Sequence, residues 1–453
     1  MLVQEPLTRP VGVSAQPSGS PVMQRRVLLT SSAWWPFTAR IAMRFAALGW
    51  HVEAACPYGH PLRKTATVGR LHGYSPLRPL AALEAAITAA QPGLIVPCDD
   101  RSAMHLYDLY PRLLAAGAPA AQVIARSLGP IESCRIAQSR SELINIARAE
   151  GVRAPEMRPV DSPAALRTAL SDVGLPAVMK VDGTWGGAGV LAVHTTEQAG
   201  RAYRLLARRL GATRALKRLL VDRDPYHLLP WLTRATPQVS VQRFVRGRPA
   251  NSLAACWNGE VLAAIHVEVL SAKNSFGSSS VVRVIEHPDM VNATETLVRR
   301  LGLSGLCGLD FMIEDTTGDA HLIEMNPRPT PICHLGLGAG RDPISALVAR
   351  LEGAPAPDPE AVTDNPVIAL FPQAWLTDPK NEALRTGYHD VPWEEPDLVI
   401  ELVRRPYSAR GLLARLCPEP APTTPLEQGT RRISGSSLLS SVTAQVSGWI
   451  TQL

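Results

Sequence analysis

Two short apolar segments that flank a run of turn-forming residues constrain the fold of this chain more than any other feature. Residues 308–314 and 321–325 each have the length and composition of a β-strand, and the sequence Asp-Thr-Thr-Gly-Asp between them predicts a β-hairpin. Side chains two residues apart in a strand project to the same face, so Glu324 and Asn326 should lie beside Asp310 of the neighbouring strand. Two carboxylates and an amide oxygen at one position are hard ligands that suit Mg²⁺ or Mn²⁺ carrying the phosphates of a nucleotide.

Arg328 follows this hairpin directly. Its guanidinium is permanently charged and has the forked geometry that binds a phosphate or a carboxylate. An acidic hairpin edge with a solvated arginine would give the same local sequence, so the interpretation depends on what else the chain contains.

A strand with an inward lysine lies upstream and is followed by a glycine-rich loop. Residues 176–181 are apolar apart from Lys180, and lysine is rare in this arginine-rich chain. The loop contains Gly183, Gly186, Gly187 and Gly189. Glycines let backbone N–H groups approach an anion, and the lysine adds a positive charge for phosphates. The alternative is an ordinary glycine-rich turn with a lysine whose stem packs on apolar surface. The GK[ST] ending of a Walker loop and the strand–loop–helix context of a Rossmann fingerprint are both missing.

A third set of strands lies between these two motifs. Residues 238–247 alternate in character and end in a turn, and two further strands, 252–256 and 261–267, are joined across Asn258-Gly259. Asn-Gly is a strong signal for a tight β-hairpin.

In this order the segments resemble the ATP-grasp superfamily, and best its carboxylate–amine ligase branch of amino-acid and peptide ligases with an N-terminal pre-ATP-grasp domain. The resemblance covers roughly residues 25–350. It rests on the strand with Lys180 and its glycine loop, then Q-x-F-V-x-G at 242–247, G-x-D-F at 308–311 and E-x-N-P-R at 324–328. An ordered set of motifs is far more specific than any one of them.

The resemblance implies a role for each matched position. Asp310, Glu324 and Asn326 would hold one or two Mg²⁺ ions, and Lys180 would contact a phosphate of ATP. The lid over the phosphates would include Gly186, Gly187 and Gly189. The adenine would lie along Gln242, Arg243, Phe244 and Val245. Arg328 would stabilise the transferred phosphoryl group or an acyl phosphate.

The sequence departs from the family at two of these positions. Arg140 opens a helix where the family often has an Asp-Lys pair, so the charge is kept and the aspartate is absent. Arg243 stands where a glutamate is common, which leaves the adenine contact open. Beyond the matched motifs, Lys273 lies in a polar loop (271–280) and Arg283 in the strand that follows it, and both could reach an acyl substrate or the phosphoryl group.

The implied activity is ligation of a small-molecule carboxylate to a small-molecule amine, with an acyl phosphate as intermediate and release of ADP and phosphate. ATP is needed because the two groups do not condense unaided in water. A small-molecule kinase and a nucleotide-binding module without turnover are the alternatives. The presence of all three predicted metal ligands, Asp310, Glu324 and Asn326, argues against the module without turnover. Carboxylation with bicarbonate is disfavoured because the chain has no visible biotinyl or glutaminase region.

The predicted fold class is α/β and α+β. A disordered leader (1–24) precedes a Rossmann-like, parallel-sheet pre-ATP-grasp domain (25–130), in which strands and helices alternate. A two-lobed ATP-grasp fold with antiparallel sheets (131–350) follows, and then a linker and a small, partly disordered C-terminal region (351–453).

Three further polar residues have two interpretations each. Asp99 and Asp100 follow a predicted strand, so they could bind a substrate amine, although capping of the next helix is the more common use of such residues. His334 could orient the acceptor or act as a base, or it could be structural.

Charge and cysteine content set the outer limits. The net charge of +6 has no concentrated basic run with aromatic residues, so we expect no nucleic-acid partner. No apolar run reaches transmembrane length, and the seven cysteines form no C-x-x-C pair, so the sequence predicts a cytoplasmic protein with reduced thiols and no membrane contact. A homodimer is compatible with the sequence, which does not fix the oligomeric state.

Overall fold

The N-terminal part of the computed structural model is a parallel sheet, as predicted. The structure describes residues 24–182, 189–208, 237–272 and 278–404. The four strands run in the order β3-β2-β1-β4, and their bounds are β1 Arg26–Thr30, β2 His51–Cys56, β3 Val68–Gly73 and β4 Leu94–Pro97. The connecting helices are α1 Thr38–Ala47, η1 Pro61–Arg63, α2 Pro79–Ala90 and α3 Asp100–Ala115. Strands β1 and β4 are buried on both faces, which is why they read as continuous apolar runs.

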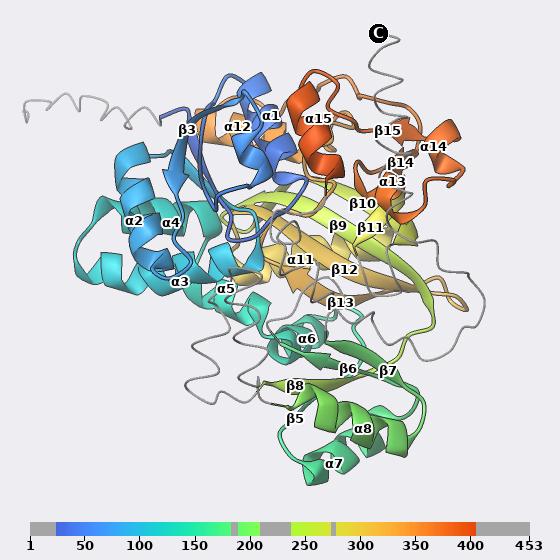
Figure 1. The fold of residues 1–453 in the computed structure, drawn as a ribbon. Coiled ribbons are helices and arrows are strands. Elements are labelled where there is room, and N and C mark those ends of the chain that lie inside the picture. Colours follow the sequence, from blue (N-terminus) through green and yellow to red (C-terminus); the bar gives the residue numbers. More distant parts are fainter. Residues whose placement is uncertain (1–23, 183–188, 209–236, 273–277, 405–453) are drawn as a thin grey trace, which may run out of the picture.

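Three helices lead from this sheet to the rest of the molecule. They are α4 Pro119–Leu128, α5 Ile131–Gln138 and α6 Arg140–Ala149. Helix α6 lies between the upper and lower parts of the molecule (Figure 1) and contacts strand β13 of the largest sheet. The first residue of α6 is therefore held between two sheets.

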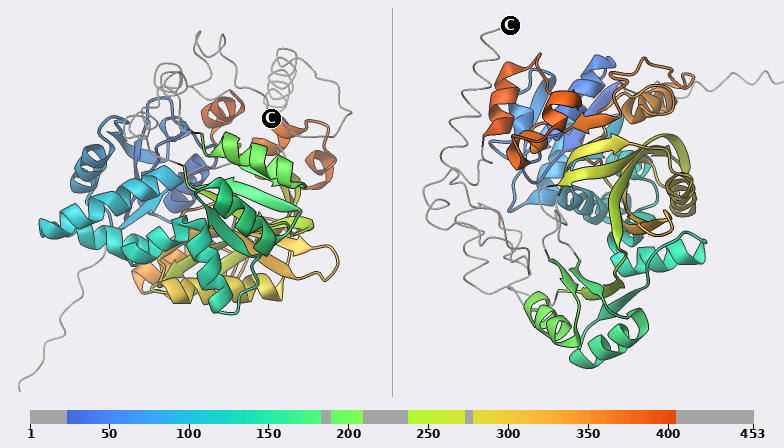
Figure 2. Two further views of the ribbon diagram at one scale, coloured as in Figure 1. Left: turned by 90° about the horizontal axis from the view of Figure 1, so that it is seen from below. Right: turned by 90° about the vertical axis from the view of Figure 1, so that its right-hand side faces the viewer.

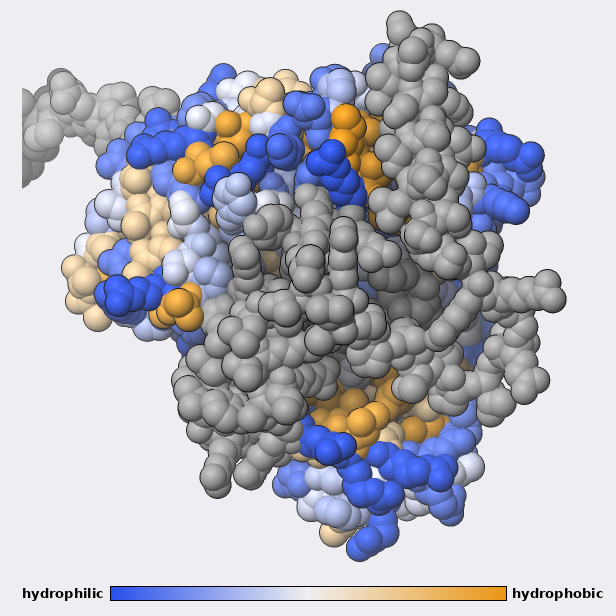
Figure 3. Space-filling view, in the orientation of Figure 1, coloured by the Kyte–Doolittle hydropathy of each residue, from blue (hydrophilic) through white to orange (hydrophobic). Residues whose placement is uncertain are grey.

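The lower lobe is a small sheet covered on one face by two helices. Its strands run in the order β5-β8-β6-β7; they are β5 Met157–Val160, β6 Ala177–Val181, β7 Val190–Val193 and β8 Val239–Arg243. The helices are α7 Pro163–Val173 and α8 Thr196–Leu206. Figure 1 and the right-hand view of Figure 2 show this lobe below the large sheet. Apolar side chains gather on the side of the lobe that faces the large sheet, above a hydrophilic outer surface (Figure 3).

The central sheet has seven strands in the order β13-β12-β9-β10-β11-β14-β15. Their bounds are β9 Gly247–Trp257, β10 Glu260–Ala272, β11 Ser279–Val284, β12 Gly305–Glu314, β13 Ala320–Asn326, β14 Val367–Ala369 and β15 Tyr388–His389. The predicted hairpin across Asn258-Gly259 is confirmed: both residues have positive φ (49° and 83°), and Trp257 pairs with Glu260.

The two faces of this sheet pack against different neighbours. On one face Leu253, Ile265 and Val267 share an apolar core with β1, β4 and helix α12 (Pro343–Glu352). On the other face Ala254, Cys256 and Cys307 pack with helix α11 (Pro288–Leu301). Helix α12 therefore lies over the first face and α11 over the second, and residues of the N-terminal domain contribute to both cores.

The C-terminal region extends the central sheet through β14 and β15. Strand β14 pairs antiparallel with β11 and parallel with β15. The helices α13 Gln373–Thr377, α14 Ala383–Thr386 and α15 Pro396–Val403 follow, and Leu398 and Leu402 of α15 pack against Ala39 of α1. The region thereby bridges the central sheet and the N-terminal domain. The predicted leader, except residue 24, and residues 405–453 lie outside the described residues.

The predicted fold class is confirmed by these sheets. Within the described ranges, no helix is both long enough and apolar enough to cross a membrane.

Candidate active site

The hairpin β12–β13 brings the three predicted metal ligands together. Asp310 pairs with Glu324, and Gly308 pairs with Asn326, so all three polar side chains lie on one face. Asn326 Nδ2 donates to Asp310 Oδ2 at 3.0 Å. Asn251 of β9, the direct neighbour of Asp310, donates its Nδ2–H to Asp310 Oδ1 at 2.8 Å. The same face carries Leu253 and Val267, which pack in one core with α12.

The carboxylates of the hairpin repel each other. Burial and the nearby Glu324 raise the pKa of Asp310 to about 6, against the two amide donors that favour the charged form. A bound cation would remove this repulsion, and oxygen donors are what Mg²⁺ prefers. No cluster of three or more His, Cys, Asp or Glu side chains suited to a metal occurs within the described ranges. The residues fit an ion held by two carboxylates and an amide, with phosphate oxygens completing its shell.

Two cations lie beside this hairpin, one at the start of α6 and one on β6 of the lower lobe. Arg140, at the start of α6, is buried and donates from Nη2 to Glu324 Oε1 at 2.9 Å. Its Nη1 donates to the carbonyl of Val181 on β6 and lies 3.6 Å from Asp182 Oδ1. Lys180 is buried, which lowers its pKa to about 8, although Glu324 favours its charged form. Arg140 thus joins the lower lobe to the hairpin β12–β13, which is called the metal hairpin below after its predicted metal ligands.

The inner face of the small sheet carries polar side chains in a row. Lys180 pairs with Ser240, and Val178 pairs with Gln242, so Lys180, Ser240 and Gln242 share a face by strand alternation. The opposite face holds the apolar core around Met179 and Val241. Ser240 Oγ and Gln242 Nε2 are enclosed, and neither atom has a hydrogen-bond partner within the described residues. Buried polar atoms are nearly always satisfied, so these two fit a polar ligand such as a nucleotide base.

The other described residues predicted to contact the nucleotide lie on the outer side of β8, in the segment after β8 and in the loop before β7. Arg243 is exposed and lies 3.9 Å from Glu156, so it does not share the inner face of Gln242. Phe244 and Val245 are half-buried in the segment between β8 and β9, and the Phe244 N–H donates to the Pro176 carbonyl. Gly189, at φ +74°, precedes β7. Gly186, Gly187 and Lys273 lie outside the described residues.

Arg328 lies where the hairpin meets the N-terminal domain. It is buried, and its Nη2 donates to Asn326 Oδ1 at 3.1 Å. Its Nε donates to Asp100 Oδ1 at 2.8 Å. The predicted phosphoryl-binding arginine is therefore beside the predicted metal ligand Asn326.

The structure does not bring Arg283 to this site. Asp310 of β12 pairs with Asn251 of β9, which pairs with Val267 of β10, so these three residues share one face of the sheet. Arg283 of β11 pairs with Glu268, the residue that follows Val267 in β10. Successive residues alternate faces, so Arg283 lies on the side of the sheet opposite Asp310. Its guanidinium lies 3.8 Å from Glu268.

Asp99 and His334 have structural partners. Asp99 is the N-cap of α3 in a capping box with Ser102, and its carboxylate also accepts from the Ser31 and Ser32 hydroxyls. Capping is therefore the observed use of this aspartate. His334 Nε2 lies 2.9 Å from Asp390 Oδ2, and burial lowers the pKa of His334.

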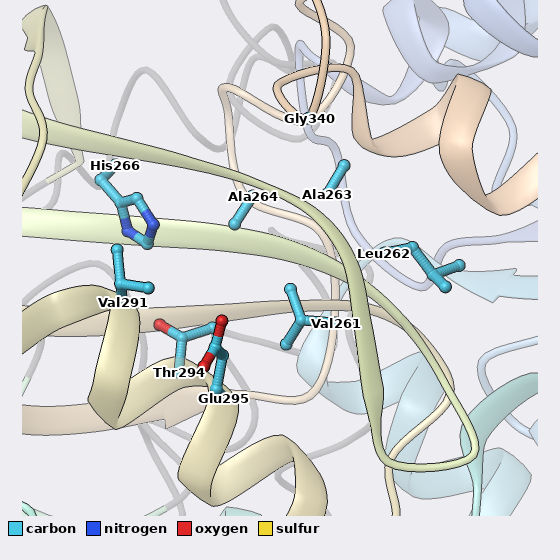
Figure 4. A pocket seen from close by; sticks show the side chains of 9 residues that line it. All are labelled: Val261, Leu262, Ala263, Ala264, His266, Val291, Thr294, Glu295 and Gly340. Atoms are coloured by element: carbon cyan, nitrogen blue, oxygen red, sulfur yellow. The ribbon is translucent and has the colours of Figure 1, made fainter. Parts of the chain in front are cut away.

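A separate cavity lies away from these residues. It has a volume of about 240 Å³ and lies between β10 and α11 (Figure 4). Val261, His266, Thr294 and Glu295 are among its lining residues, and none of the predicted site residues lines it. Its small size and mixed lining give no sign of a nucleotide site.

Sequence reasoning missed Asn251, Ser240 and the link between Asp100 and Arg328. Ser240 is two residues before Gln242, so strand alternation could have found it. Asn251 and Asp100 stand in no motif, and only the packing of distant segments reveals their partners.

Comparison with known proteins agrees with this arrangement. Residues 231–331 match the family model described as the ATP-grasp domain. The chain has an ATP-grasp fold. The matched segment runs to just past Arg328, so it includes the metal hairpin and the inner strand β8 of the ATP-grasp lobes. No curated protein gives a significant match to the sequence.

Solved structures share the ATP-grasp fold at low sequence identity. N5-carboxyaminoimidazole ribonucleotide synthetase from Thermus thermophilus is 17% identical with a TM-score of 0.53, over 74% of this chain and 80% of that one. The biotin carboxylase domain dimer of Hydrogenobacter thermophilus 2-oxoglutarate carboxylase, complexed with MgADP, ADP and bicarbonate, is 13% identical with a TM-score of 0.54, over 75% and 72%. L-amino acid ligase from Bacillus licheniformis is 14% identical with a TM-score of 0.51, over 72% and 76%.

Proposed function

We propose that this protein is an ATP-dependent carboxylate–amine ligase that forms an amide through an acyl phosphate and releases ADP and phosphate. The observation that carries the proposal is the convergence of Asp310, Glu324 and Asn326 with the buried cations Lys180 and Arg140 between the two lobes. Such an arrangement gathers negatively charged groups that otherwise repel one another. The proposed substrates are a small-molecule carboxylate and a small-molecule amine.

The residues of the lower lobe would bind ATP. The unpartnered polar atoms of Ser240 and Gln242 are suited to hydrogen bonds with the nucleotide, and Lys180 on the same strand face is suited to its phosphates. Mg²⁺ bound by the hairpin oxygens would neutralise phosphate charge and orient the γ-phosphate. Magnesium ADP in the Hydrogenobacter neighbour supports this pairing of nucleotide and metal.

In this reaction the protein would neutralise charge and exclude water from the site, and it would form no covalent intermediate with the substrate. A carboxylate oxygen attacks the γ-phosphorus, the bond to ADP breaks, and the product is an acyl phosphate. The amine nitrogen next attacks the acyl carbon, phosphate leaves, and the nitrogen loses a proton. Arg140 and Arg328 would balance the charge that builds on the phosphoryl oxygens, and the site must exclude water from the acyl phosphate. The synthetase and the amino acid ligase among the structural neighbours support this class of reaction.

ADP and phosphate release from purified protein and MgATP tests the proposal. The assay covers a matrix of amino acids and small carboxylates, with and without amines, and the products are identified by mass. The ligase predicts release that needs both substrates and a product lighter than their sum by one water. A phosphorylated product without an amine would instead indicate a kinase, and MgATP binding without release in any mixture would favour a non-catalytic module.

A further inference from the structure

Arg328 is anchored in the N-terminal domain as well as in the metal hairpin. Its Nε–H donates to Asp100 Oδ1 at 2.8 Å, and both groups carry charge, so this is a strong hydrogen bond. The Asp100 side chain is 30% exposed, whereas that of Arg328 is only 9% exposed. The aspartate therefore holds a guanidinium that is otherwise removed from water.

Asp100 and its neighbour Asp99 have separate duties. Asp99 accepts from Ser102 N and from the Ser31–Ser32 loop, and so begins helix α3. Asp100 is the first residue of that helix, and the structure gives its carboxylate a partner in the other domain. Capping of helix α3 explains the contacts of Asp99, but it does not explain the contact between Asp100 and Arg328.

The remaining contacts fix the orientation of the guanidinium. Nη2 donates to Asn326 Oδ1 at 3.1 Å, and Nη1 donates to the Pro329 carbonyl at 3.3 Å. The ring of Trp35, from the loop after β1, lies 5.8 Å from the Arg328 guanidinium carbon. An arginine has five N–H groups in a rigid plane, and three are used by these partners and Asp100. Among the residues that the structure describes, the other two N–H groups have no hydrogen-bond partner, so they are available to an anion beside the metal hairpin.

We propose that Asp100 is a positioning residue: it holds Arg328 so that the free N–H groups meet the phosphoryl group during its transfer, and so couples the N-terminal domain to phosphoryl transfer. This inference rests on the proposed function. Because Asp100 acts through Arg328, its loss should weaken binding of the transferring phosphoryl group and leave binding of ADP unchanged. The N-terminal domain would then contribute to chemistry and not only to substrate selection.

The test compares the affinity for MgADP with the affinity for MgADP plus aluminium fluoride, which mimics the transferring phosphoryl group. The full-length protein is titrated with each, and the ratio of the two dissociation constants is recorded. We expect aluminium fluoride to tighten wild-type binding, and Asp100→Asn to reduce that gain at least tenfold while the dissociation constant of MgADP changes less than twofold. Asp100→Glu, which keeps the carboxylate, should recover part of the gain.

Asp108→Asn is the matched control. Asp108 lies on the same helix, and its carboxylate is half exposed and 3.6 Å from Arg135, far from the hairpin in the chain. The gain from aluminium fluoride should stay at the wild-type value in this variant. Melting temperatures of all variants are measured, and Asp100→Glu decides the matter if Asp100→Asn does not fold.

Three other outcomes would contradict either the positioning role of Asp100 or the proposed function. A gain in Asp100→Asn within twofold of wild type overturns the positioning role. No gain in the wild type, although MgADP binds, also overturns it, because Arg328 then does not meet a phosphoryl group. Failure of the wild type to bind MgADP at all contradicts the proposed function itself.

Discussion

A methyl group added at Gly308 should destabilise the protein through a single contact. An ideal Cβ at this position would lie 2.3 Å from Thr330 Cγ2, closer than real Cβ contacts allow, and the next nearest atom would be Thr330 Cβ at 3.5 Å. Gly308 does not have a positive φ, so the backbone itself accepts alanine. Thr330 is buried two residues after Arg328, so it has little room to move.

The expected magnitude follows from two opposing effects. Overpacking a buried site costs about 1–3 kcal/mol. Replacing glycine by alanine also restricts the unfolded chain, which returns about 0.4–1 kcal/mol. The difference between the midpoints of these two ranges predicts that Gly308→Ala lowers the free energy of unfolding by about 1.3 kcal/mol. Because Gly308 pairs with Asn326, the same displacement should also weaken binding of MgADP.

A double-mutant cycle with Thr330→Ala isolates the contact. The alanine removes Cγ2, so in the Thr330→Ala background Gly308→Ala should stabilise the protein by about 0.4–1 kcal/mol, because only its effect on the unfolded chain remains. The coupling energy should then equal the full overpacking cost of about 1–3 kcal/mol. Urea unfolding followed by tryptophan fluorescence measures all four proteins. A Gly308→Ala variant as stable as wild type, or additive effects in the double variant, would refute the packing argument.

Three further changes test other parts of the site. Lys180→Met should raise the dissociation constant of MgATP at least tenfold, because a hydrogen bond to a charged group contributes about 1.5–3 kcal/mol; an unchanged constant would remove Lys180 from the nucleotide site. Glu324→Gln keeps the side-chain shape and removes a metal-binding charge, so turnover should be lost without a fall in melting temperature, and normal turnover would exclude the metal assignment. Burial lowers the pKa of His334, so the imidazole stays neutral in the folded protein while the unfolded chain takes up a proton below about pH 6.5. The free energy of unfolding should therefore decrease as the pH is lowered through that range. His334→Gln should make the unfolding free energy flatter between pH 7.5 and 5, and an equally steep loss in the variant would show that other groups cause it.

The metal hairpin could be predicted from sequence because its signals are local. Two apolar strands, a turn between them and the two-residue spacing of Glu324 and Asn326 are all contained in one short segment. Strand alternation then fixes which side chains share a face, and pairing with β12 adds Asp310. The Asn-Gly turn was predictable for the same reason, since positive φ at two successive positions is a property of those residues.

Strand alternation alone does not say which face of a strand meets the site. Arg283 was expected near the phosphoryl group because it follows a polar loop, yet its register with Glu268 puts it on the opposite side of the sheet from Asp310. The register of β11 depends on its pairing with β10, which contains an irregularity at Ser271. Each one-residue change in register exchanges the faces of every side chain.

The strands, the turns, the order of the motifs and the type of chemistry that their side chains support could all be predicted from the sequence, because these depend on residues close together in the chain. Which distant groups meet became clear from the folded molecule: Asn251 with Asp310, Arg140 with Glu324, and Asp100 with Arg328. Such pairs depend on how whole sheets and helices pack, and a polar residue carries no local sign of the partner that burial will require it to find.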